Sequence, residues 1–145
     1  MEINSNIQCV THGLVLKDSK ILVYEVEDKV KKKTFFRLIG GHIEFGESAS
    51  DALKREFKEE IDEEIEIIQK LKVFENIFTY KGRSQHEFVS LFEVRFLNKD
   101  PYSKNIIIGH EGPHRTFKAK WIDIRDFDDI QKVLYPPEVL DYLSK

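Results

Sequence analysis

The sequence predicts an α/β domain in which the strands of a mixed sheet lie on both sides of a central helix. Two observations carry this prediction: β-rich runs occur before and after one acid-rich amphipathic stretch, and a shorter helical pattern closes the chain. A length of 145 residues suits one domain and is enough to bury a real core. We therefore expect a single domain over residues 1–145.

The composition is that of an ordinary soluble protein. Hydrophobic residues make up 41% and charged residues 34% of the chain, and no apolar run approaches the length of a membrane span. The N-terminus, MEINSNIQCV, lacks a basic segment followed by an apolar one, so no signal peptide is expected. The single cysteine, Cys9, cannot form an internal disulfide and fits a reducing cytoplasm. A net charge of −3 argues against general nucleic-acid binding, so neither nucleic acid nor a membrane is an expected partner.

The first part of the chain predicts strands at residues 7–17, 21–26 and 34–39. Asp18 and Ser19 are turn residues between the first two, which makes them neighbouring strands. Residues 27–33 are charged and predict a solvated loop, with a phosphate-attracting role for its lysines as the alternative. The third strand leads into an expected glycine turn at Gly40 and Gly41.

A central helix follows this turn. Ser48 is its predicted N-cap, and Asp51 can reach back to the free backbone amides. At about 100° per residue, one broad apolar arc contains Ala49, Ala52, Leu53, Phe57 and Ile61. Glu56 and Glu60 project within this arc and Glu59 lies at its edge. Three carboxylates are therefore expected to face the protein body.

An acid-rich helix is most simply a solvated helix with charge pairs, but the spacing here fits that interpretation poorly. Glu56 and Glu60 are like charges at i,i+4, which destabilises a helix by roughly 0.2–0.5 kcal/mol, and Arg55 with Glu59 is the one obvious favourable pair. Crowded carboxylates beside an apolar face need a counter-charge, which a divalent cation supplies. Oxygen ligands select Mg²⁺ or Mn²⁺, and a preceding glycine pair lets a backbone carbonyl or amide approach an ion or a phosphate.

The same stretch resembles the Nudix box, G-x5-E-x7-R-E-U-x-E-E-x-G-U, in which U is a bulky apolar residue. The positions that match at the required spacing are Gly41, Glu47, Arg55, Glu56, Phe57, Glu59 and Glu60. Two positions depart from the pattern, because the box glycine is Asp62 and the last apolar residue is Glu63. Asp tolerates the left-handed conformation that often ends a helix, so these departures affect the helix exit rather than the acids. The usual proline before the glycine pair is Ile39, which we interpret as structural.

This resemblance implies a Nudix fold, an α/β/α sandwich with a mixed β-sheet. It also implies a hydrolase that cleaves a nucleoside diphosphate linked to another group, with metal ions that polarise phosphoryl oxygens and lower the pKa of the attacking water. The metal ligands implied are the Gly40 carbonyl, Glu56, Glu59 and Glu60. The catalytic group implied by the box consists of Glu59 with Glu47 and Arg55, which would brace the loop and the helix through a salt bridge.

After the helix, residues 64–80 predict one bent strand or two, and residues 86–96 predict a partner strand beyond a turn that contains Gly82. The aromatic residues of this pair are Phe78, Tyr80 and Phe88. We interpret them as core residues, with stacking on a base as the alternative.

Residues 98–116 are predicted to be irregular, and loops this long are often functional. The segment HEGPH from His110 to His114 matches the zinc-protease pattern H-E-x-x-H, but Gly112 and Pro113 prevent the helix that this pattern requires. Many Nudix enzymes resemble one another in taking a general base from a loop outside the box. Glu111 is the candidate here, with His110 behind it and simple solvation as the alternative.

The C-terminal part predicts a strand at residues 117–124, a short helix at 126–134, and a last helix that begins at Pro136 or Pro137 and runs through Leu143.

Together these features predict a metal-dependent pyrophosphohydrolase acting on a small nucleoside diphosphate derivative. The alternatives are a non-catalytic Nudix domain that senses a nucleotide, and a structural domain whose acidic helix has no metal affinity. The nature of the group attached to the diphosphate, the general base, the number of ions and the formation of a homodimer stay open at this stage.

Overall fold

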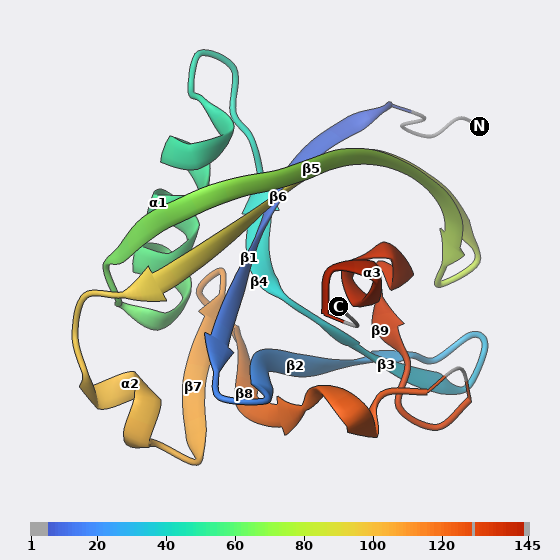
Figure 1. Ribbon diagram of the computed structural model, residues 1–145. Coiled ribbons are helices and arrows are strands. Elements are labelled where there is room, and N and C mark those ends of the chain that lie inside the picture. The colour runs from blue at the N-terminus through green and yellow to red at the C-terminus, as the bar shows by residue number, and fades with distance from the viewer. Residues whose placement is uncertain (1–5, 129, 144–145) are drawn as a thin grey trace.

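The computed structural model describes residues 6–128 and 130–143, and its core is a strongly bent mixed sheet. The strands are β1 (Gln8–Lys17), β2 (Lys20–Asp28), β3 (Lys33–Arg37), β4 (Ile39–His42), β5 (Ile65–Tyr80), β6 (Arg83–Phe96), β7 (Ile106–Glu111), β8 (Arg115–Asp123) and β9 (Leu134–Tyr135). The helices are α1 (Ala49–Ile61), α2 (Asp100–Ser103) and α3 (Leu140–Leu143), with 3-10 turns η1 (Ile124–Asp126) and η2 (Pro137–Val139). Helix α1 lies on one side of the sheet and α3 on the other (Figure 1).

Strand β1 is the centre of the sheet. It runs parallel to β6 and antiparallel to β2 and β4. The sheet continues from β6 to β5 on one side and from β2 through β3 to β9 on the other, while β8 pairs with β2 and β7 pairs with β8. The parallel β1–β6 pairing makes the sheet mixed, and the layers on its two faces confirm the predicted α/β/α sandwich.

Two apolar cores fill these faces because successive side chains of a strand point in opposite directions. On β1, Val15 belongs to the core under α1, whereas Val10 and Leu14 belong to the core under the C-terminal segment. Helix α1 contributes Leu53 and Phe57, both fully buried. Its close approach depends on Gly13, because a Cβ atom there would lie only 2.7 Å from the Phe57 ring.

The ends of α1 agree with the sequence prediction. Ser48 is the N-cap, and its side chain accepts a hydrogen bond from the backbone N–H of Asp51 at 3.1 Å. At the other end Asp62 has φ 55°, in the left-handed region, and its N–H bonds to the carbonyl of Lys58. Asp62 therefore takes the conformation of the glycine that it replaces in the box pattern.

Two neighbouring turns are held together by Asp28, which is 3% exposed. Its carboxylate accepts hydrogen bonds from the N–H groups of Val30, Lys31 and Lys81. The Lys31 ammonium also donates to the carbonyl of Thr79 at 2.8 Å. The β2–β3 turn and the β5–β6 turn are thereby joined at the far end of both hairpins.

Two local predictions, the glycine turn and the irregular segment, are wrong. Gly40 and Gly41 lie in strand β4, paired with β1, and the turn comes later, at Gly46 with φ 92°. Residues 98–116 are not irregular throughout, because they contain α2 and β7. The β-branched run of Ile106 and its neighbours pairs with β8, a long-range contact that the glycines and prolines around it concealed.

The predicted helix at residues 126–134 is also not formed in the described part of that segment, which is irregular beyond η1. The carboxylate of Asp128 accepts hydrogen bonds from the N–H groups of Ile130, Gln131 and Lys132 and so closes a loop where a helix would otherwise begin. The last helix, η2 followed by α3, is present as predicted. Within residues 6–128 and 130–143, no helix is both long and apolar enough to cross a membrane.

Candidate active site

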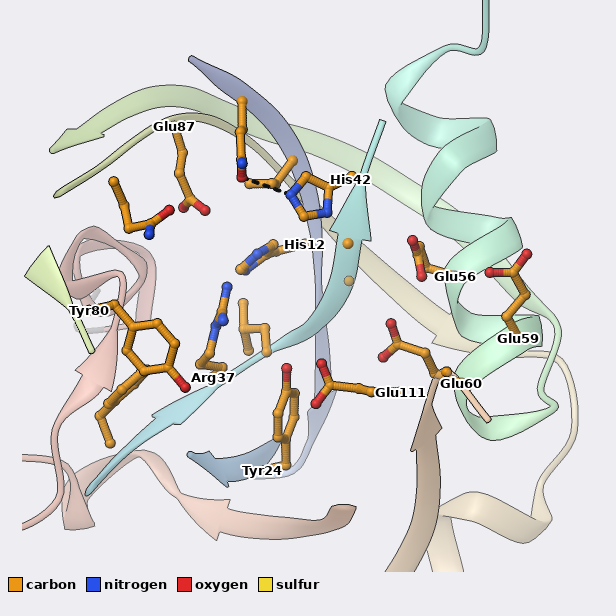
Figure 2. A pocket seen from close by; sticks show the side chains of 18 of the residues that line it. His12, Tyr24, Arg37, His42, Glu56, Glu59, Glu60, Tyr80, Glu87 and Glu111 are labelled. Carbon is orange, nitrogen blue, oxygen red and sulfur yellow. Dashed lines mark hydrogen bonds between the residues drawn. The ribbon is translucent and has the colours of Figure 1, made fainter. Parts of the chain in front are cut away.

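A cavity of about 610 Å³ opens between α1, the β1–β4 pair and the end of the β5–β6 hairpin. Its lining includes the carboxylates of α1, the glycine pair, and a group of polar and aromatic side chains on the strands (Figure 2). The predicted site residues that line it are Gly40, Gly41, Glu56, Glu59, Glu60, His110 and Glu111. Glu47 and Arg55 are not part of this lining, but they pair with each other and Arg55 contacts Glu56 and Glu59.

The α1 carboxylates differ in exposure. Glu60 is buried, with 8% of its surface exposed, the Glu56 side chain is 14% exposed, and the Glu59 side chain is 58% exposed. Strand β4 approaches α1 so closely that a Cβ atom at Gly41 would overlap the carboxylate of Glu56. A Cβ atom at Gly40 would overlap the backbone carbonyl of Thr11 on β1. The glycine pair is thus required by two close contacts rather than by a turn.

Arg55 joins the loop before α1 to the acids of the helix. Its guanidinium contacts Glu47 at 2.6 Å, Glu59 at 3.1 Å and Glu56 at 3.3 Å, and donates to the carbonyl of His42 at 3.0 Å. The bonds from Arg55 hold the pKa of Glu47 below its ordinary value. The predicted Glu47–Arg55 salt bridge is present, and it fixes the position of the helix face that carries the carboxylates.

The acid form of Glu60 is favoured in the metal-free molecule. Burial raises the pKa of Glu60 well above its ordinary value, and the adjacent carboxylates of Glu56 and Glu111 add to the rise. Its Oε1 atom is buried without a hydrogen-bond partner among the described residues. An unpartnered buried oxygen next to a second carboxylate is a destabilising arrangement unless a cation or a proton balances it.

These residues fit a divalent ion. Glu56 and Glu60 supply hard carboxylate oxygens, Glu59 lies one turn away at the surface, and β4 brings backbone close to them. No three His, Cys, Asp or Glu side chains in residues 6–128 and 130–143 are already gathered at ligand spacing. In the metal-free chain the Arg55 guanidinium contacts both Glu56 and Glu59 and supplies part of the positive charge that an ion would provide. The role of Glu56, Glu59 and Glu60 as metal ligands stays a prediction.

Glu111 reaches the cavity from a strand rather than from an irregular loop. It is the last residue of β7, which packs beside α1, and Figure 2 shows its carboxylate near Tyr24 and Glu60. His110 precedes it on the strand and also lines the cavity. The strand and the following turn rule out a helical H-E-x-x-H site at this position. Glu111 therefore lines the same cavity as Glu60, and its carboxylate helps to raise the pKa of Glu60.

Across the cavity from α1 lie His12 and Glu87, which the sequence interpretation missed, and Arg37, which it left as facing either a substrate or solvent. His12 and Glu87 are 3% and 6% exposed, and Figure 2 shows the Arg37 side chain pointing toward His12, with Glu87 farther along the cavity. Burial lowers the pKa of His12 to about 3, with Arg37 the next cause, so this imidazole is neutral near pH 7. Strand alternation is the sequence signal that could have identified His12 as buried, because His12 shares a strand face with Val10 and Leu14 of the core.

Two of the three aromatic residues interpreted as core belong to the wall of this cavity. Phe78 and Tyr80 are half-buried and line it, while Phe88 is exposed on another surface. Phe78 packs on Tyr135 with a centroid distance of 4.7 Å, and Phe35 meets the edges of both tyrosines at 5.9 Å. The core interpretation is therefore wrong for all three residues, and the exposed faces of Phe78 and Tyr80 are available to a ligand.

The chain has a mixed sheet between helices, and a helix that carries carboxylates meets the strand that contains Gly40 and Gly41 at a cavity. These features are typical of proteins that process phosphate compounds. Residues 9–143 match the NUDIX domain family. The chain belongs to the Nudix family. The match spans nearly all of the described residues and confirms the membership predicted from the box.

Curated relatives carry the same family name. The chain is 26% identical over 140 residues to YvcI, an uncharacterized Nudix hydrolase of Bacillus subtilis. This alignment covers 96% of the present chain and 80% of YvcI. The chain is also 26% identical over 107 residues to the uncharacterized Nudix hydrolase all7351 of Nostoc, covering 74% of this chain but only 50% of that protein.

Solved structures share the fold at low identity. A UDP-X diphosphatase matches with a TM-score of 0.65 at 16% identity over 99% of this chain, although this chain spans only 64% of its length. A MutT NUDIX hydrolase of Burkholderia pseudomallei matches with a TM-score of 0.60 at 17% identity, over 97% of this chain and 100% of that one. An ADP-ribose pyrophosphatase of Streptococcus suis matches with a TM-score of 0.59 at 16% identity, over 95% and 90% of the two chains. At these identities the matches show that the chain shares its fold with these proteins.

Proposed function

We propose that the chain is a metal-dependent hydrolase of the pyrophosphate bond in a nucleoside diphosphate linked to another group. The observation that carries this proposal is the pair of α1 carboxylates at the wall of a cavity against a glycine strand, with Glu60 buried and Glu56 half-buried. Similarity to a UDP-X diphosphatase and to an ADP-ribose pyrophosphatase supports the same reaction class. Mg²⁺ or Mn²⁺ is the proposed cofactor, because all side-chain donors are carboxylates.

In this proposal the α1 carboxylates bind the metal ion, and Arg55 positions them. Glu56, Glu59 and Glu60, with the carbonyl of Gly40, would hold the ion. A bound divalent ion supplies positive charge to the phosphoryl oxygens and lowers the pKa of a water molecule. Arg55 keeps Glu56 and Glu59 in place through the contacts described above, and Glu47 holds Arg55. Charge is thereby positioned before the substrate arrives.

Glu111 is the residue that we assign as general base. Its carboxylate lies near Glu60 in the cavity and would take a proton from the attacking water. The water oxygen forms a bond to phosphorus, the bridging P–O bond breaks, and two phosphate-containing products leave. The neighbouring His110 lines the same edge of the cavity and is available to contact a product phosphate. A reducing cytoplasm is the proposed compartment, since Cys9 is a free cysteine.

The proposal predicts product release from a panel of nucleoside diphosphate derivatives, namely nucleotide sugars, ADP-ribose, dinucleoside polyphosphates and oxidised nucleoside triphosphates. Release of phosphate-containing products should require Mg²⁺ or Mn²⁺ and should stop when excess chelator is added. Coupled phosphate detection and chromatography of the nucleotide products measure it.

Binding of a nucleotide without turnover of any compound would instead favour the sensor function. The intact acid set argues against this second candidate, because a binding module gains nothing from like charges gathered beside an apolar face.

A further inference from the structure

The cavity has two chemically different ends. One end carries the α1 carboxylates, and the opposite end, here called the polar end, is formed by His12, Arg37 and Glu87 (Figure 2). The polar end belongs to three different strands, β1, β3 and β6. Nothing in the proposed hydrolysis step uses these residues, so their arrangement needs its own explanation.

Each member of the polar end has a buried polar atom without a partner. Among residues 6–128 and 130–143, the Nδ1 atom of His12, the Nε atom of Arg37 and the Oε1 atom of Glu87 are buried and make no hydrogen bond. His12 is 3% exposed and Glu87 is 6% exposed. Folded proteins satisfy most buried polar atoms, and three unsatisfied ones around a single cavity indicate that a ligand completes their bonding.

The charges of the polar end limit the chemical class of this ligand. Glu87 adds an anionic acceptor, and burial raises its pKa while the nearby Arg37 guanidinium opposes the rise. A phosphate group would be repelled by the carboxylate of Glu87. A neutral group that offers N–H donors to Glu87 and an acceptor to Arg37 satisfies both side chains.

The wall beside the polar end favours a flat ring. Phe35, Phe78 and Tyr80 line the cavity, and Phe35 meets Tyr80 edge to face at 5.9 Å. The turns that carry this wall are fixed by Asp28. A planar heterocycle stacks on such surfaces, as nucleobases commonly do.

We propose that the polar end binds the base of the substrate and selects guanine. This inference rests on the proposed function, which places the diphosphate at the α1 carboxylates. Guanine alone among the common bases presents two adjacent donors, N1–H and N2–H, which match the two oxygens of the Glu87 carboxylate. Its O6 and N7 acceptors are the groups that arginine binds, and these would face Arg37.

Nucleoside monophosphates test this selection separately from hydrolysis, because they contain no pyrophosphate bond. Calorimetric titration with GMP, AMP, CMP and UMP should give tightest binding for GMP, by about 10-fold or more over AMP. Glu87→Gln should weaken GMP by on the order of 10-fold while leaving AMP unchanged or tighter, since glutamine pairs with adenine. The arginine and histidine of the polar end stay unchanged in this variant.

Glu93→Gln is the matched control, because Glu93 lies on the same strand, bonds to Gln69 at 2.9 Å and is outside the cavity lining. It should bind all four monophosphates as the wild type does, and thermal melting checks that both variants fold. Another base binding more tightly than GMP, or an unchanged order of affinities in Glu87→Gln, would overturn the inference.

Turnover of GDP-glucose, ADP-glucose, CDP-glucose and UDP-glucose then separates this inference from the proposed function. Preference for GDP-glucose that Glu87→Gln lowers about 10-fold or more supports both. Guanine-selective binding of GMP, without turnover of these sugars or of any other compound in the substrate panel, supports the polar end and contradicts the hydrolase. Turnover of all four sugars at equal kcat/KM, unaffected by Glu87→Gln, contradicts the base selection and leaves the hydrolase in place.

Discussion

Replacement of Glu60 by glutamine is expected to lower kcat by on the order of 10³-fold, equal to about 4 kcal/mol of transition-state stabilisation. The amide preserves the size of the side chain but removes the negative charge that would hold the ion. Glu60 has an unpartnered Oε1 atom next to Glu56, so no other group in the described chain substitutes for it at that position. Steady-state turnover with Mg²⁺, and with Mn²⁺, measures the loss.

The same variant should leave the fold intact and change its response to pH. The pKa of Glu60 is raised above the ordinary value of 4.5, so the folded metal-free chain keeps a proton that the unfolded chain releases. The free energy of unfolding therefore falls as pH rises above 4.5, and Glu60→Gln should remove that fall. Denaturant unfolding at several pH values in chelator measures it.

Asp51→Asn is the matched control on α1, because Asp51 is exposed and points away from the cavity. It should keep wild-type turnover and the wild-type pH response. Wild-type turnover in Glu60→Gln, with metal present, would defeat the assignment of Glu60 as a ligand.

Gly41→Ala is expected to lower activity, whereas Gly40→Ala is expected to lower the stability of the fold. At Gly41 the added Cβ atom overlaps the carboxylate of Glu56, the mobile end of a side chain, so the chain should fold while Glu56 is displaced. A displacement of about 1 Å at a catalytic group costs on the order of 10²-fold in rate. At Gly40 the overlap is with the backbone carbonyl of Thr11, which cannot move without breaking the β1–β4 pairing.

Gly40→Ala should therefore lower the free energy of unfolding by about 3 kcal/mol, at the upper end of overpacking effects. Thermal melting and kcat, measured on both variants, separate the two outcomes. Each variant serves as the control for the other, since the change in side chain is identical. Equal losses of stability in the two, or full activity in Gly41→Ala, would contradict the close contacts described above.

The helix that carries the box was predictable because its information is local. The spacing of Glu56, Glu59 and Glu60 on a periodic helix correctly placed Glu56 and Glu60 toward the protein body, whereas Glu59 lines the cavity with 58% of its side chain exposed. The Arg55–Glu47 bridge followed from the box pattern and is present at 2.6 Å. Asp62 adopted the left-handed conformation for the reason expected of it.

The rest of the site could not be predicted because it depends on which strands become neighbours. His12, Arg37 and Glu87 come from three strands, and the parallel pairing of β1 with β6 places His12 and Glu87 on neighbouring strands, with Glu87 opposite Gln8 and His12 opposite Leu91. The strand that begins at Ile106 was predicted to be part of a loop, because its hydrogen-bond partner, β8, could not be identified from the sequence. Gly40 was placed in a turn because a glycine pair in a strand has a reason only when the facing groups are known.

The central claim, that the α1 carboxylates hold a divalent ion for hydrolysis, is tested most directly by Mn²⁺ binding. Electron paramagnetic resonance of free Mn²⁺ should show saturable binding to the wild-type chain that excess Mg²⁺ displaces. A Glu56→Gln and Glu60→Gln double variant should lose this binding while keeping its thermal transition. Equal Mn²⁺ affinity in the wild type and the double variant would contradict the claim and remove the basis for the proposed chemistry.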